Sequence, residues 1–141
     1  MPRRKDRFAA LKLLKKASAP DPEEVRAQQN KIRASFLKLL EGCAEPKDFD
    51  TVAMHVNVCK LRALEISEAL ADVLTAAQVA NSKVRERYVQ WGKLQVMAAE
   101  REAVADALEA CDAIVEASTP LQMEVAYKRM IQGLLKSVKK T

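Results

Sequence analysis

The chain has 141 residues, the usual length of one domain, and 49% of them are hydrophobic, so it can bury a core without disulfides or metals. Only 4% are aromatic and three are glycine, and helix-forming residue types dominate, which favours an all-α fold and argues against disorder. The net charge of +5 is uneven: residues 1–16 carry +6 and residues 120–141 carry +4, which leaves an acidic middle. Basic ends of this kind are typical of segments that bind phosphates or an acidic protein surface.

The cysteines and the N-terminus indicate the cellular compartment. Cys43, Cys59 and Cys111 are odd in number and far apart, so they do not form a complete disulfide framework. The apolar stretch of residues 8–14 is interrupted by Lys12, which is typical of neither a secretory signal nor a membrane span. We therefore expect a cytoplasmic protein without a membrane association.

Residues 1–20 are predicted to be a basic N-terminal segment, followed by a single all-α domain over residues 21–141. The segment contains a short amphipathic helix with Phe8, Leu11 and Leu14 on one side and lysines on the other. An isolated helix this short is marginal in water, so we expect it to order against a partner.

The first helix of the domain is marked at both ends. Asp21 can cap its N-terminus, and Pro22 suits the first helical position. The helix should end near Glu41, because Gly42 can take the left-handed closing conformation.

The longest periodic segment follows Pro46, with Asp48 as its predicted cap. Apolar residues alternate spacings of three and four there, which is a heptad pattern. Further apolar side chains lie beside the pattern, so we expect this helix at the centre of the bundle with more than one neighbour. The heptad residues are Phe49, Val52, Val56, Cys59, Ala63, Ile66, Leu70, Val73 and Ala77.

Two interpretations of the end of this segment remain open. Weak helix formers around Asn81 are compatible with a tight turn or with one continuous helix that ends near Gly92. A continuous helix from Asp48 would be about 65 Å long at 1.5 Å per residue, too long to bury in a small domain. It would need a second chain, and this is the basis of a homodimer hypothesis.

A second heptad pattern runs from Leu94 to Val115, and Ser118 ends that helix. Thr119 and Pro120 then cap and begin the last one. The sequence thus predicts a bundle of four to five helices with one long central heptad-patterned helix, forming a dimer. The apolar face of the last helix contains Met123, Tyr127, Met130, Ile131, Leu134, Leu135 and Val138.

The sequence contains few of the residues and motifs that catalytic sites require, so we predict no enzymatic activity and no cofactor. His55 is the only histidine, and the chain has neither a glycine-rich phosphate loop nor a nucleophile motif. His55 and Cys59 are four residues apart and can share a metal ion, but two ligands are too few for zinc. Cys59 is instead expected to be a small core residue, and no metal site is predicted.

Basic residues cluster beside the only tryptophan in residues 83–93. This combination suits a protein anchor or a surface on which bases stack. The competing interpretation is a core stripe of Val84, Tyr88 and Trp91, because aromatic residues at helical spacing are usually buried. The predicted partner-binding residues are Arg85, Arg87, Tyr88, Trp91 and Lys93.

These observations predict a non-enzymatic protein-binding module, namely an adaptor, regulator or inhibitor that acts through a helical surface. The alternative is a small nucleic-acid-binding accessory protein whose basic ends and residues 83–93 follow phosphates. The basic side chains that this alternative requires at the ends are Arg3, Arg4, Lys5, Arg7, Lys12, Lys15, Lys16, Lys136, Lys139 and Lys140.

Overall fold

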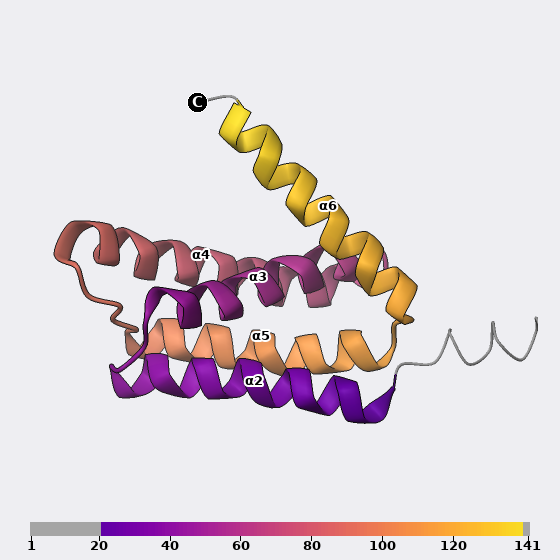
Figure 1. The fold of residues 1–141 in the computed structure, drawn as a ribbon, viewed down its shortest axis with the longest axis horizontal. Coiled ribbons are helices and arrows are strands. Elements are labelled where there is room, and N and C mark those ends of the chain that lie inside the picture. Colours follow the sequence, from indigo (N-terminus) through magenta and orange to yellow (C-terminus); the bar gives the residue numbers. More distant parts are fainter. Residues whose placement is uncertain (1–20, 140–141) are drawn as a thin grey trace, which may run out of the picture.

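The computed structural model describes residues 21–139, with side chains up to residue 137. Over this range the chain is all-helical without strands, as predicted (Figure 1). No helix among these residues is both long and apolar enough to cross a membrane. The predicted helix around residues 8–14 and the basic side chains of residues 3–16, 139 and 140 lie outside the described part. The helices are α2 (Pro22–Glu41), α3 (Pro46–Ala63), α4 (Glu68–Trp91), α5 (Ala98–Glu116) and α6 (Pro120–Lys139).

The central helix is α3, which packs against α2, α4, α5 and α6. Figure 1 shows α2, α3, α4 and α5 running alongside one another, whereas α6 crosses them and extends away. The helix that carries the first half of the heptad pattern therefore has several neighbours, which is consistent with the expected bundle. The core side chains that are at most 1% exposed are Val52, Val56, Cys59, Ala63, Leu74, Ala77, Val84, Ala107, Cys111 and Ile114.

Both predicted ends of α2 are confirmed. The Asp21 carboxylate accepts the backbone N–H of Glu23 at 3.0 Å, and Pro22 occupies the first turn. Gly42 closes the helix with a φ of 76°, a left-handed conformation that a Cβ would strain.

The predicted cap of α3 is wrong by three residues. Glu45 is the N-cap, Pro46 follows it, and Asp48 lies within the first turn. The Asp48 carboxylate accepts the backbone N–H of Glu45 at 2.9 Å and the Ser35 hydroxyl at 3.2 Å. Asp48 therefore satisfies the N-terminus from inside the helix and also joins α3 to α2.

The single helix predicted over the first heptad pattern is also wrong, because the chain breaks between α3 and α4. Ser67 caps α4, with its hydroxyl 3.4 Å from the backbone N of Leu70. Ile66, a heptad residue, is 42% exposed in this break. The helix then continues through Asn81 to Trp91 without a turn. No 65 Å helix exists to require a second chain, so this motive for the homodimer hypothesis is removed.

The junction between α5 and α6 follows the prediction. The Thr119 hydroxyl accepts the backbone N–H of Gln122 at 3.1 Å, and the Gln122 side chain accepts the N–H of Thr119 at 2.8 Å. The apolar face of α6 is buried in one part and exposed in another. Ala126 and Met130 are buried in a small cluster with Val58 of α3, whereas the apolar residues further along α6 are largely exposed.

Replacing Ser67 by Ala should lower the free energy of unfolding by about 1 kcal/mol, because α4 then loses its N-cap. Ser82→Ala is the matched control: Ser82 is exposed in the interior of α4, where Ala is the better helix former. Urea unfolding monitored by circular dichroism measures both. Equal stabilities of the two variants would contradict the assignment of Ser67 as the cap.

Candidate functional site

The predicted partner surface lies at the C-terminal end of α4. Arg85 and Lys93 are exposed, and Trp91 is 69% exposed. Tyr88 is half-buried and lines a hollow of about 590 Å³ beside the loop that follows Gly92. The core interpretation holds for Val84, which is 1% exposed, but is wrong for Trp91. Trp91 is exposed because α4 is longer than its neighbours: it has 24 residues, whereas α3 has 18 and α5 has 19. Its last turn therefore extends past its neighbours (Figure 1).

Arg87 differs from the other residues of this predicted surface because its guanidinium binds within the chain. It pairs with both carboxylate oxygens of Glu100, one of them at 3.0 Å, and donates to the backbone carbonyl of Gln95 at 2.8 Å. Glu100 is buried and also accepts the backbone N–H of Met97 at 2.9 Å. Arg87 thus fastens the end of α4 to the start of α5.

Glu100 is ionised in this network. Burial raises the pKa of its carboxyl group, but hydrogen bonds from Arg87 and Met97, together with the charge of Arg87, lower the pKa by more. The pKa of Glu100 is therefore below its usual value. Its carboxylate stabilises the fold at neutral pH, and this contribution is lost as the pH falls through the lowered pKa.

The projecting half of α6, from residue 131 onward, continues an exposed apolar stripe that begins at Tyr127. Tyr127 is 48% exposed, Leu134 50% and Leu135 57%, and Ile131 is half-buried between them. These residues recur at helical spacing on one side of α6. Figure 1 shows this half of the helix extending away from the bundle. The sequence predicts the stripe but not its exposure.

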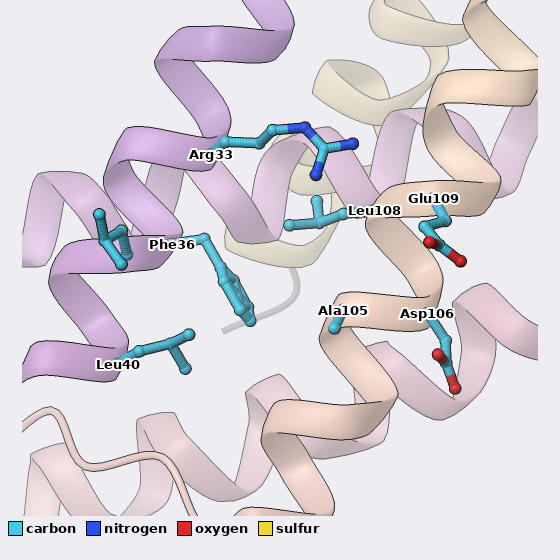
Figure 2. Close-up of a pocket in the computed structure, with 8 residues that line it drawn as sticks. Arg33, Phe36, Leu40, Ala105, Asp106, Leu108 and Glu109 are labelled. Atoms are coloured by element: carbon cyan, nitrogen blue, oxygen red, sulfur yellow. The ribbon is translucent and has the colours of Figure 1, made fainter.

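A groove of about 430 Å³ separates α2 from α5. Figure 2 shows Phe36 and Leu40 of α2 facing Ala105 and Leu108 of α5 across it. Leu37, on the α2 side, is 54% exposed. The groove is therefore lined largely by apolar side chains, and Leu37 is accessible to solvent.

Acidic side chains border this groove on α5. Asp106 and Glu109 line it, and Glu102 is exposed one turn before Asp106. Arg33 of α2 forms an ion pair with Asp112 of α5 across the two helices. A largely apolar groove with a carboxylate rim is suited to an amphipathic helix that carries positive charges.

A cluster of potential metal ligands lies between α3 and α5. The ligand atoms of His55, Cys59 and Cys111 are all within 4.8 Å of one another. Cys59 and Cys111 are fully buried, as expected for core residues, and His55 is half-buried. The sequence shows the pair on α3 but not Cys111, which comes from another helix. The only available signal is that both cysteines occupy heptad positions that face the core.

The two buried thiols have unequal acidities. A hydrogen bond from Cys111, together with a hydrogen bond and the charge of His55, lowers the pKa of Cys59 to about 6 despite its burial. The pKa of Cys111 is raised because it donates this hydrogen bond and because it is buried beside Cys59. Cys59 is therefore the thiol that ionises first.

Four of the basic residues that the nucleic-acid alternative uses are described and exposed. Lys136 is exposed on α6, and Lys83, Arg85 and Lys93 are exposed near the end of α4. The other basic side chains of this prediction lie outside the described residues. Comparison with known proteins found no matching family model, no matching curated protein and no matching solved structure.

Replacing Glu100 by Gln should lower the free energy of unfolding by about 2 kcal/mol at neutral pH, because Arg87 loses its buried charged partner. The difference from the wild type should shrink as the pH falls below the usual glutamate pKa of about 4.3 and through the lowered pKa of native Glu100. Urea unfolding at neutral and acidic pH tests both statements. Glu102→Gln, at an exposed position on α5, is the control and should change stability by less than about 0.5 kcal/mol. A pH-independent difference would contradict this role of Glu100.

Proposed function

We propose that this chain is a non-enzymatic protein-binding module that docks through the projecting half of α6. The observation that carries the proposal is the exposure of Leu134 and Leu135, at 50% and 57%, on a helix that leaves the bundle. Exposed apolar side chains at helical spacing are typical of a helix that binds in the groove of another protein. Tyr127 adds an aromatic anchor to the same stripe, and aromatic residues contribute strongly to binding energy.

The positive charge of α6 indicates that the partner has an acidic surface. After Glu124 the chain carries five basic residues and no acidic one. The structure describes Lys136 as exposed beside the apolar stripe, whereas Arg129 is bound to Glu65 at 2.8 Å. The partner is therefore a protein with an apolar groove that carboxylates border.

The α2–α5 groove of a second copy has this chemistry. The stripe from Tyr127 to Leu135 and the groove from Arg33 to Leu40 are each about 10–12 Å long at 1.5 Å per residue. Leu37 can contact the stripe, and the carboxylates of α5 can face the lysines of α6. Exchange of α6 in both directions buries both surfaces and closes a two-fold dimer. The homodimer hypothesis is thus retained with a different interface.

Sedimentation of the full chain over a range of concentrations should show a monomer–dimer equilibrium. Leu134→Asp on the helix and Leu37→Asp in the groove should each weaken it at least tenfold, because a charge in an apolar contact costs more than about 1.4 kcal/mol. Val79→Asp makes the same change at an exposed position of α4 and should leave the equilibrium unchanged. A monomer at every concentration would exclude the second copy as the partner.

Affinity capture from an extract of the source cell tests the wider proposal. The wild type should retain a defined protein partner after nuclease treatment and at high salt, and Leu134→Asp should lose it. Trp91→Ala tests the surface at the end of α4 in the same experiment, with Val79→Asp as the control. Equal capture by the wild type and Leu134→Asp would contradict docking through α6. Capture that nuclease or salt abolishes would favour the nucleic-acid alternative.

A further inference from the structure

The cluster formed by His55, Cys59 and Cys111 has the dimensions of a metal site. The Nε2 atom of His55 is 3.7 Å from the Sγ atom of Cys59, and the Sγ atom of Cys111 is within 4.8 Å of both. In a tetrahedral zinc site with Zn–S of about 2.3 Å and Zn–N of about 2.0 Å, ligand atoms are separated by about 3.6–3.8 Å. The observed Nε2–Sγ separation agrees with this value, and small side-chain adjustments would bring Cys111 to it.

The surrounding helices hold these ligands in place. His55 and Cys59 are one turn apart on α3, and Cys111 lies on α5, which packs directly against α3. Both cysteines are 0% exposed, so their rotamers are restricted by packing. Little ordering of the chain is therefore needed when an ion binds.

An ion can reach the cluster from the side of His55. This residue lines a second groove, of about 470 Å³, between α2, α3 and α6. Of the three ligands, His55 alone lines this groove, so a water molecule or an external ligand at the fourth position of a tetrahedral ion would enter beside His55. Three protein ligands with an open fourth position is a known arrangement for zinc.

The donor atoms select the class of metal. Two thiolates and one imidazole favour a thiophilic ion such as Zn²⁺ over Mg²⁺ or Ca²⁺, which prefer oxygen ligands. Binding would release the two thiol protons to the buffer, leaving two thiolates and a neutral imidazole on the metal. Cys43 is exposed in the loop between α2 and α3 and is not part of the cluster.

We propose that His55, Cys59 and Cys111 bind one Zn²⁺ ion, which ties α3 to α5 in the core of the bundle. The three ligands lie on α3 and α5 and none belongs to the docking surface on α6, although Tyr127 of that surface lines the groove beside His55. It revises the expectation of no metal site, which was based on two ligands, because the fold adds the third.

Titration of the reduced full chain with Co²⁺, a spectroscopic substitute for Zn²⁺, tests the site. The wild type should develop the thiolate-to-cobalt charge-transfer absorbance and the intense visible bands of tetrahedral Co²⁺, with one equivalent bound, and Zn²⁺ should abolish both. Cys111→Ala should lose the charge-transfer signal or reduce the affinity at least a hundredfold. Cys43→Ala, at the exposed cysteine, should behave as the wild type.

His55→Gln keeps the experiment decisive if the cysteine variants fail to fold. The half-buried His55 can be replaced with less disturbance to the core, and this variant should bind Co²⁺ at least tenfold more weakly while its circular dichroism remains unchanged. No charge-transfer band in the wild type, or equal bands in the wild type and Cys111→Ala, would overturn the proposal. A Cys59–Cys111 disulfide in the purified protein, with no Co²⁺ uptake after reduction, would overturn it as well.

Discussion

Four helices pack around α3, and the positions of the other elements depend on how its surface is shared. At 1.5 Å per residue this 18-residue helix is only about 27 Å long. Cys59 and Ala63 are fully buried, and their small side chains allow neighbouring helices to approach closely. The helices α2, α4 and α5 also cover part of the surface of α3. The first half of α6 packs on α3 through Ala126 and Met130. The exposure of the second half of α6 follows from this limited surface.

Both ends of α2, the end of α4 and the junction between α5 and α6 could be predicted because their signals are local hydrogen-bond patterns. Asp21 with Pro22, and Thr119 with Pro120, each supply a capping oxygen next to a proline in the first turn, and both pairs act as expected. Gly92 likewise ends α4 in a left-handed conformation, with a φ of 73°. These features depend on a few consecutive residues and need no knowledge of the tertiary fold.

The break between α3 and α4 could not be predicted from the heptad pattern. Both helices turn their apolar residues toward the same core, so the spacing from Val56 to Ala77 continues although the chain changes direction. Ile66 fits the pattern and is nevertheless exposed. Periodicity reports which residues face a core, and it does not report whether one helix or two carry them. Ser67 was the available signal, but a serine without a neighbouring proline or glycine is a weak one.

The candidate sites were predictable only in part, because they depend on distances between helices. The exposure of Trp91 follows from the lengths of α3 and α5 relative to α4, which the sequence of α4 does not contain. Arg87 was grouped with the surface residues, but its partner Glu100 is 13 residues away on the next helix. The cluster at Cys59 could not be predicted for the same reason, because core positions on two different helices come together only when the bundle packs.

In the proposed docking, charge separation within the chain favours contact of α6 with a partner over contact with its own bundle. Glu102, Asp106 and Glu109 are exposed on α5, whereas α6 leaves the bundle from the side of α3. Among the ion pairs of the described residues, α6 meets the rest of the bundle through Arg129 and Glu65, at the midpoint of α6. Lys136 lies beyond this contact and is exposed, and in the proposed docking its charge would meet carboxylates such as those of α5. Attraction between such surfaces accelerates and orients association, and burial of the apolar stripe supplies most of the affinity. Salt should therefore slow association with a partner of this kind more than it speeds dissociation.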